Sequence, residues 1–249
     1  MQDIQNNLDF KTITEPAECS ACGKPYVRTV HLLSGRRVFV GRRCPACDAR
    51  WQEERLAEER ASKAQEHEAE WAELCPWEHR LLTETRGHTD LTLLEAAQPD
   101  WRKVLDWEYG PLGLLLRGET GTCKTRSVWR LARKLFDQDI RVTALTAGQF
   151  DRQCRKAAGQ FELPGWFDEL VRARVLFFDD LGKGAWTPHT EANFFDLVDQ
   201  RTCEGRPLLV TTNDSGRSLA ERFSPDRAEP LIRRLREYCR CLTFEKRAA

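Results

Sequence analysis

LGLLLRGETGTCKT, residues 112–125, is the stretch of the sequence that decides the fold. Residues 112–117 form a short apolar run of the length expected for a buried strand. Residues 118–125 contain two glycines and end in Lys-Thr, and the pattern of residues 124–137 predicts a helix immediately afterwards. A strand, a glycine-containing loop and the beginning of a helix, in this order, are the context of a phosphate-binding loop.

The chemistry of this loop follows from its backbone. Successive N–H groups and the positive end of the following helix surround the oxygens of an anionic phosphate. Lys124 reaches the β- and γ-phosphates of a nucleotide, and the Thr125 hydroxyl binds Mg²⁺. The residues predicted to hold ATP are Gly118, Glu119, Thr120, Gly121, Thr122, Cys123, Lys124 and Thr125. The alternative is a glycine turn before an ordinary helix.

One position departs from the usual loop pattern, which has glycine before the lysine where this sequence has Cys123. Cysteine keeps the backbone donor but adds a Cβ atom where the chain passes close to phosphate. If the loop needs a helical φ here, cysteine is tolerated; if it needs a positive φ, nucleotide affinity suffers. The thiol also lies at the beginning of a helix beside a lysine, which favours the thiolate and sensitivity to oxidation.

Beyond the loop, short apolar runs alternate with helical stretches up to Phe244. The predicted strands are residues 112–117, 141–146, 174–180, 207–213 and 240–244, and the predicted helices are residues 124–137, 147–158, 165–172, 188–204 and 227–237. Thr187 followed by Pro188 is a typical helix beginning, with a hydroxyl at the N-cap and proline at the first helical position. The alternation predicts an α/β fold, a parallel sheet with helices on both faces.

Two of these strands end in polar groups. Residues 174–180, RVLFFDD, end in Asp179 and Asp180, and ligands bind at this edge of a parallel sheet. We expect Asp179 to hold Mg²⁺, directly or through water, and Asp180 to orient or deprotonate the attacking water of a hydrolysis. Asn213 ends the next strand and is expected to position that water. The alternatives are a strand that ends in solvated aspartates and a simple Thr/Asn turn.

Four of the ten cysteines form two close pairs. The pairs are Cys19 with Cys22 and Cys44 with Cys47. The 21 residues between the pairs (23–43) slightly exceed the spacing of zinc sites with four cysteines, and the segments on either side of Ser34-Gly35 have a hairpin pattern. We expect a closed, structural zinc site, without which a module of low apolar content would hardly fold. The alternatives are four unligated thiols and His31 as a substitute ligand.

The chain divides into a zinc-binding module over residues 1–50, a helical linker over 51–82 and a nucleotide-binding domain over 83–249. Residues 49–82 lack glycine and are rich in Glu, Ala and Arg, which predicts a long solvated helix. Its apolar residues gather only towards its end, where the helix is expected to dock; they are Trp71, Leu74, Trp77 and Leu81. A coiled-coil partner helix is the alternative, although no apolar heptad is sustained.

The composition excludes several classes of protein. The chain has 249 residues, of which 41% are hydrophobic and 31% charged, and no net charge, which is a globular composition rather than a disordered one. Its apolar runs are shorter than the ~18 residues of a membrane span, and the N-terminus has no secretory pattern. We expect a cytoplasmic protein with reduced thiols. The zero net charge argues against a general nucleic-acid coat protein but leaves room for a local basic groove.

With these motifs the chain resembles the DnaC/DnaI group of bacterial and phage helicase loaders within the AAA+ ATPases. The resemblance rests on GETGTCKT, LFFDDLGKG, the run NFFDLVDQRTCEGRPLLVTTN, and IRRL followed by the final strand. It implies that Lys124 and Thr125 are Walker A residues and that Asp179 and Asp180 are the Walker B pair. Asn213 would be the first sensor. The chain ends five residues after Phe244, so no C-terminal helical lid and no second sensor are expected.

The resemblance also implies partners. The zinc module would contact a replicative DNA helicase, and subunits would associate through the ATP site, where Arg234 would act in trans as an arginine finger. The basic cluster that holds it, Arg233, Arg234 and Arg236, has a solvated helix face as its alternative interpretation. Candidate contacts to single-stranded DNA are Lys183, Arg152, Arg155 and Lys156, which solvated charge explains equally well.

Two other functions are compatible with the same sequence. One is a transposase-assisting ATPase of the IstB type, which shares the core but resembles only the ATPase block, so the zinc module favours the loader. The other is an adaptor without enzymatic activity that binds nucleotide weakly and interacts through its zinc module. Cys123 in the loop and an aspartate at position 180, where many ATPases have glutamate, favour the adaptor.

Overall fold

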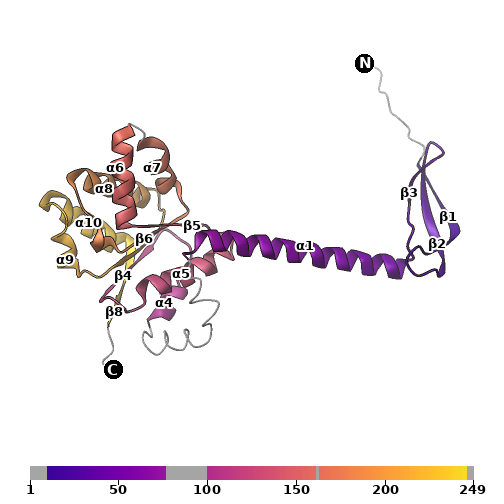
Figure 1. Cartoon of the computed structure of the whole chain (residues 1–249), viewed down its shortest axis with the longest axis horizontal. Helices are drawn as coiled ribbons and strands as arrows, with labels where there is room; N and C mark the ends of the chain where they lie inside the picture. Colours follow the sequence, from indigo (N-terminus) through magenta and orange to yellow (C-terminus); the bar gives the residue numbers. More distant parts are fainter. Residues whose placement is uncertain (1–9, 77–99, 161–162, 246–249) are drawn as a thin grey trace, which may run out of the picture. The chain divides into compact units, whose positions relative to one another are not determined.

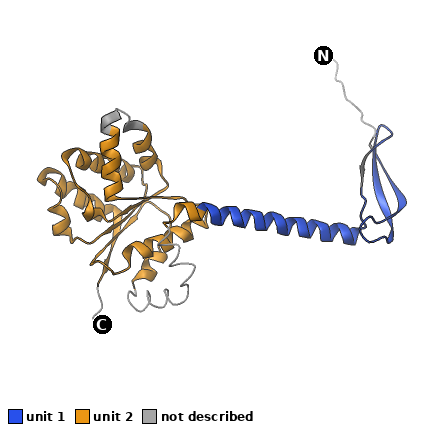
Figure 2. Ribbon diagram, in the orientation of Figure 1, with its two compact units in different colours: residues 1–70 blue, residues 71–249 orange. Residues whose placement is uncertain are grey.

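The structure is a computed structural model of the whole chain, and it describes residues 10–76, 100–160 and 163–245. The chain divides into two compact units, Met1–Glu70 and Trp71–Ala249 (Figure 2). The predicted boundary region around residue 82 lies outside the described residues. Among the helices that the structure describes, none is long and apolar enough to cross a membrane.

The first unit begins with a small antiparallel sheet in the order β1-β2-β3. Its strands are β1 (Phe10–Glu18), β2 (Pro25–Leu33) and β3 (Arg36–Val40). The predicted hairpin is confirmed: Ser34 and Gly35 both have positive φ, 48° and 78°, as a two-residue hairpin turn of the favoured hand requires. Strand β1 was not predicted, because its mixed sequence FKTITEPAE has no clear strand pattern of its own. It is a strand in the structure because it pairs with β2 along its whole length.

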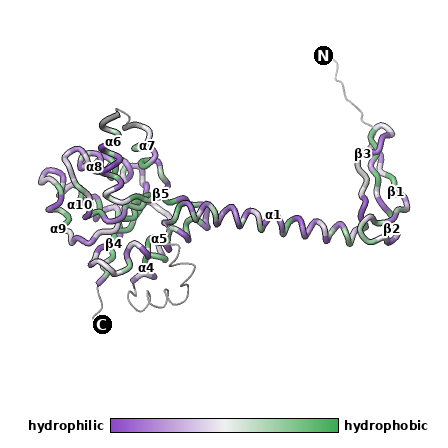
Figure 3. Tube along the Cα trace, viewed as in Figure 1, coloured by the Kyte–Doolittle hydropathy of each residue, from purple (hydrophilic) through white to green (hydrophobic). Residues whose placement is uncertain are grey.

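A long helix, α1 (Pro45–Leu74), follows this sheet. It begins four residues earlier than predicted, because proline is well suited to the first helical position, so Cys47 lies in its first turn. Figure 3 shows α1 as mostly hydrophilic along its length, in agreement with the predicted solvated helix. The predicted continuation to residue 82, including Trp77 and Leu81, lies outside the described residues.

The second unit is built on a five-stranded parallel sheet in the order β5-β6-β7-β4-β8 (Figure 1). Its strands are β4 (Gly113–Gly118), β5 (Val142–Thr146), β6 (Val175–Asp179), β7 (Leu208–Thr212) and β8 (Cys239–Phe244). All five predicted strands are present and every pairing between them is parallel. The sequence prediction of a parallel α/β sheet is therefore confirmed.

Helices cover both faces of this sheet. The predicted helices are present as α5 (Lys124–Phe136), α6 (Ala147–Gln160), α7 (Leu163–Arg172), α8 (Pro188–Cys203) and α10 (Pro225–Tyr238). The short elements α4 (Trp101–Leu105), η1 (Leu181–Lys183) and α9 (Gly216–Ala220) were not predicted, because they hold too few residues for a periodic pattern. Thr187 and Pro188 begin α8 as predicted, with the Thr187 hydroxyl accepting from the Thr190 N–H.

Alternate residues of the strands belong to two separate cores. Leu114 and Leu116 of β4 pack with α5, whereas Leu115 packs with α8, α9 and α10 on the opposite face. The last turn of α1 belongs to the α5 side: Trp71 is buried, with its ring centroid 6.2 Å from that of Trp129. Different helices therefore pack on the two faces of the sheet, and β4, β6 and β7 all end at its carboxyl edge.

Candidate nucleotide site and metal centre

The predicted phosphate-binding loop connects β4 to α5 at the carboxyl edge of the sheet. Gly118 has φ 146°, and a Cβ atom there would lie 1.9 Å from the Phe244 carbonyl oxygen. Gly121 has φ 84° with open space around it. Only glycine fits the first position, because a side chain would collide with the end of β8, and glycine is favoured at the second by its backbone angle.

Lys124 is buried at the centre of the loop, with only 5% of its surface exposed. Its ammonium group donates hydrogen bonds to the carbonyl oxygens of Gly118 (2.7 Å) and Glu119 (2.8 Å) and to Asn213 Oδ1 (2.9 Å). Burial lowers the pKa of Lys124, and the nearby carboxylates of Asp180 and Asp179 oppose this shift. The structure therefore brings the predicted lysine and the predicted asparagine into direct contact.

The carboxylate of Asp179 lies beside the beginning of α5. The Thr125 hydroxyl donates to Asp179 Oδ1 at 2.8 Å, and the Thr211 hydroxyl donates to the same oxygen. The Thr211 oxygen in turn accepts the backbone N–H of Asp180 at 2.9 Å. A hydroxyl and a carboxylate side by side form an oxygen donor set that fits Mg²⁺, which is bound through few protein ligands and several waters.

The cleft in front of the loop has a volume of about 320 Å³. It is lined by Thr120, Gly121, Cys123, Lys124, Thr125, Arg126, Asp180, Lys183 and Asn213. Asp180 is in the left-handed region at φ 55°, and its carboxylate accepts from Lys183 Nζ at 2.8 Å. Sequence reasoning did not assign Arg126 or Lys183 to this cleft, although Arg126 directly follows the motif and Lys183 lies three residues after Asp180.

Cys123 adopts a left-handed conformation, with φ 66° and ψ 20°. Of the two possibilities left open by the sequence, the loop thus has the positive φ that glycine adopts freely. A residue with a Cβ atom is destabilised there by roughly 1–2 kcal/mol. The loop therefore keeps the backbone geometry expected for glycine while carrying a thiol.

Replacing Cys123 by glycine is expected to stabilise the second unit by about 1 kcal/mol, because relief of the left-handed strain exceeds the extra flexibility of glycine in the unfolded chain. For a unit of this size, thermal unfolding should shift upwards by about 2–4 °C. Cys123→Ala is the matched control, since it removes the thiol but keeps the Cβ atom. An equal gain in both variants would show that the thiol, and not the backbone angle, is the source of the strain.

Arg234 lies away from the cleft of its own subunit. Its guanidinium forms an ion pair with Asp199 of α8 and lies 5.8 Å from the centre of the Phe195 ring. The neighbouring Arg233 is far more exposed, with 67% of its side chain accessible and only a long 3.9 Å contact to Glu237. The predicted role of Arg234 in trans stays a prediction, and it requires the Asp199 pair to open.

The four paired cysteines lie together in the first unit. Their sulfur atoms are all within 4.8 Å of one another, and they belong to Cys19, Cys22, Cys44 and Cys47. The Cys22 and Cys44 sulfurs are 3.8 Å apart, which matches the edge of about 3.8 Å in a tetrahedron with Zn–S bonds of about 2.3 Å. His31 contacts Thr12 at 3.2 Å and is not part of the cluster.

The surroundings of the cluster suit thiolate ligands. The backbone N–H of Cys44 donates to Cys19 Sγ at 3.2 Å. This bond is the main cause that lowers the pKa of Cys19 to about 6. Hydrogen bonding to the Cys22 side chain is the main cause that raises the pKa of Cys47 to about 12. Four sulfur atoms within 4.8 Å of one another, one of them with a lowered pKa, fit a closed structural zinc site better than four independent thiols.

Removal of metal by a chelator is expected to unfold residues 15–50 and to leave the second unit folded, because the small sheet has little core of its own. Zinc content and amide hydrogen exchange in each unit measure this outcome. Cys19→Ser should have the same effect, whereas Cys203→Ser, which removes an exposed thiol outside the cluster, should not. Purified protein without zinc and with a protected first unit would contradict the metal site.

No protein-family model matches the sequence, and no curated protein matches it. Solved structures do match the fold. A crystal structure of DnaI shares 22% identity at a TM-score of 0.50, over 59% of this chain and 80% of that one. A crystal structure of the DnaC helicase loader shares 16% identity at a TM-score of 0.51, over 65% of this chain and 90% of that one.

AMPPCP-bound DnaA from Aquifex aeolicus also matches, with 14% identity and a TM-score of 0.51. The match covers 59% of this chain but only 45% of the DnaA chain. The second unit therefore has an AAA+-like α/β fold, a five-stranded parallel sheet with helices on both faces. In this fold, and at low sequence identity, it is similar to the solved structures of DnaA, DnaC and DnaI.

Proposed function

We propose that the second unit binds and hydrolyses ATP at the cleft in front of residues 118–125. The observation that carries this proposal is the hydrogen-bonded set of Lys124 with Asn213 and Thr125 with Asp179. Four polar side chains from three elements converge at one edge of the sheet, next to a loop rich in backbone donors. A simple glycine turn or solvated strand end would not require these side chains to meet.

Each polar residue of the cleft would have its own role in the binding or hydrolysis of ATP. ATP supplies the triphosphate, which the loop N–H groups and Lys124 would bind, with Lys124 exchanging its two carbonyl partners for phosphate oxygens. Thr125 and Asp179 would hold Mg²⁺. Asp180 and Asn213 would position the attacking water, and Asp180 would accept its proton. Asp180 must first loosen its contact with Lys183, which predicts slow turnover in the isolated protein.

We further propose that the protein is a helicase loader that acts on a replicative DNA helicase and on single-stranded DNA. Support comes from the structural similarity of the second unit to DnaC and DnaI, and from a separate four-cysteine module joined to it by a solvated helix. The four-cysteine module would bind the helicase. Bound ATP would promote the association of several subunits, with Arg234 of one subunit at the ATP site of the next. Arg234 would then leave Asp199 for the phosphate of a neighbouring subunit.

Co-purification tests this proposal. The full chain should capture the replicative helicase of the same organism when ATP is present, and the capture should be lost in Cys19→Ser. Capture of a neighbouring transposase instead of the helicase would favour the transposase-assisting alternative. The left-handed Cys123 favours one further candidate, an adaptor that binds nucleotide weakly; helicase capture that does not depend on ATP would support that candidate.

A further inference from the structure

A buried hydroxyl group connects the two aspartates at the end of β6. It belongs to Thr211 of the neighbouring strand β7, a residue that is completely buried. The Thr211 hydroxyl donates to Asp179 Oδ1 and accepts the backbone N–H of Asp180 at 2.9 Å. Since a backbone N–H can only donate, the single proton of this hydroxyl is committed to the Asp179 carboxylate. One oxygen atom therefore holds the side chain of the first aspartate and the backbone of the second.

The contact with Asp179 extends to the beginning of α5. Asp179 Oδ1 also accepts the Thr125 hydroxyl at 2.8 Å, so two hydroxyl protons converge on one carboxylate oxygen. Thr125 lines the nucleotide cleft, and because its proton is directed to Asp179, its oxygen offers only lone pairs to the cleft. A hydroxyl in this state is suited to bind Mg²⁺. Thr211, being completely buried, contacts the predicted metal ligand Asp179 without contacting a ligand in the cleft.

The contact with Asp180 restrains an unusual backbone conformation. Asp180 has φ 55°, in the left-handed region that residues with a Cβ atom rarely adopt. Such a conformation persists only where the surrounding structure holds it, and here the Thr211 oxygen accepts the Asp180 N–H. Without this acceptor the backbone of Asp180 would relax, and its carboxylate, which lines the cleft, would change its position.

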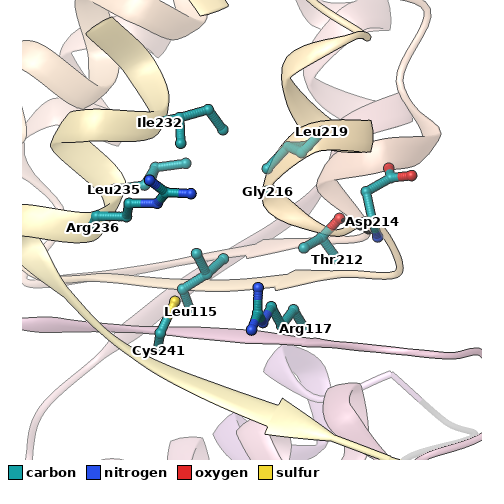
Figure 4. Close-up of a pocket in the computed structure, with 10 residues that line it drawn as sticks. All are labelled: Leu115, Arg117, Thr212, Asp214, Gly216, Leu219, Ile232, Leu235, Arg236 and Cys241. Atoms are coloured by element: carbon teal, nitrogen blue, oxygen red, sulfur yellow. Dashed lines mark hydrogen bonds between the residues drawn. The ribbon is translucent and has the colours of Figure 1, made fainter. Parts of the chain in front are cut away.

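The next residue, Thr212, carries the same hydroxyl group in a different environment. Successive side chains of a strand face opposite sides of the sheet. Leu209, two residues before Thr211, packs in the core on the α5 side. Figure 4 shows Thr212 on the other side, in a hollow between the sheet and helices α9 and α10, and its hydroxyl accepts the Asp214 N–H at 3.1 Å. Thr211 is thus directed towards α5 and the nucleotide loop, whereas Thr212 is not.

We infer that Thr211 is a positioning residue of the nucleotide site: its hydroxyl holds Asp179 for the binding of Mg²⁺ and Asp180 for the orientation of the attacking water. The inference rests on the proposed function and names a further residue that controls the same site. Replacement of a side chain that hydrogen-bonds to a metal ligand typically costs about 10–100-fold in metal affinity or activity. Loss of the Thr211 hydroxyl should therefore weaken the binding of Mg²⁺ and slow hydrolysis, while the affinity for metal-free nucleotide stays the same.

Two pairs of proteins isolate the contribution of this hydroxyl. Thr211→Val differs from the unaltered protein by a methyl group in place of the hydroxyl, and Thr211→Ala differs from Thr211→Ser only by the missing hydroxyl. The second pair decides the question if Thr211→Val does not fold. Thr212→Val is the matched control, because it removes a buried hydroxyl that accepts a backbone N–H on the opposite face of the same strand.

Titration with a fluorescent ATP analogue, in EDTA and again with excess Mg²⁺, tests the inference. The ratio of the two dissociation constants measures how much the metal contributes to nucleotide binding. This ratio should fall by about tenfold in Thr211→Val relative to the unaltered protein, and in Thr211→Ala relative to Thr211→Ser. The affinity in EDTA should stay the same in all of these proteins, and Thr212→Val should keep the ratio of the unaltered protein. Turnover should fall with the ratio.

Amide hydrogen exchange at Asp180, followed by NMR, provides a second measurement that needs no nucleotide. The Asp180 N–H should exchange about tenfold faster in Thr211→Ala than in Thr211→Ser, because its acceptor is lost. Absence of nucleotide binding by the unaltered protein would defeat the proposed ATPase, whereas equal exchange at Asp180 in both variants would defeat the role of Thr211. An unchanged ratio in folded Thr211→Val, or equal losses of affinity with and without Mg²⁺, would also overturn the inference.

Discussion

Replacement of Lys124 by alanine should reduce ATP turnover by at least about 100-fold. The ammonium group is the one buried cation of the loop, and it would make charge-assisted hydrogen bonds to phosphate oxygens. Loss of two such bonds, at about 1.5–3 kcal/mol each, corresponds to two or more orders of magnitude in rate. Release of inorganic phosphate measures turnover, and a fluorescent ATP analogue measures affinity.

The same replacement also removes contacts within the protein, so its effect on folding needs a control. Lys124 bonds to two carbonyl oxygens and to Asn213, and these acceptors lose a donor in the variant. Thermal unfolding of the variant, and turnover of Lys103→Ala, an exposed lysine on α4, separate the two effects. Turnover that survives Lys124→Ala in a folded protein would remove the enzyme assignment altogether.

Much of the second unit was predictable because the local and the long-range signals coincide. Residues 113–116 (GLLL) carry no polar side chain and are buried in the sheet, and Gly118 has no Cβ atom that would collide with the end of β8. The carboxylates of residues 179 and 180 follow an equally apolar strand. Since parallel strands end at the same edge of a sheet, these features alone place the loop and the aspartates together. The spacing of the cysteines likewise indicated the cluster of the first unit.

Other features depend on packing that no local pattern encodes. The positive φ of Cys123 could not be predicted, because cysteine is compatible with a helical φ as well. Arg234 looked like an available cation in the sequence, yet Asp199, 35 residues earlier, pairs with it across two helices. Sequence reasoning therefore located the motif but not the partners of its charged neighbours.

Sequence reasoning also missed Arg201, a buried arginine whose guanidinium group bonds to backbone carbonyls and not to a carboxylate. Arg201, near the end of α8, is 0% exposed, and burial lowers its pKa to about 10. One of its terminal nitrogens donates to the carbonyl oxygens of Leu170 (2.6 Å), Val171 (3.0 Å) and Ala173 (2.9 Å), and the other donates to that of Pro207 (2.8 Å). The cation is thus stabilised by carbonyl dipoles, including the negative end of α7.

Replacement of Arg201 by methionine should therefore destabilise the second unit by about 3 kcal/mol, since several buried carbonyls lose their donors while the volume stays similar. Thermal unfolding should fall by about 6–12 °C. Arg201→Lys keeps the charge and three donors but cannot span both α7 and Pro207, so its loss should be about a third as large. Because Pro207 directly precedes β7, which leads to Asn213, the methionine variant should also weaken nucleotide binding. A methionine variant as stable as the unaltered protein would show that the hydrogen bonds from Arg201 to the backbone carbonyls do not stabilise the second unit, and that only the volume of the side chain matters.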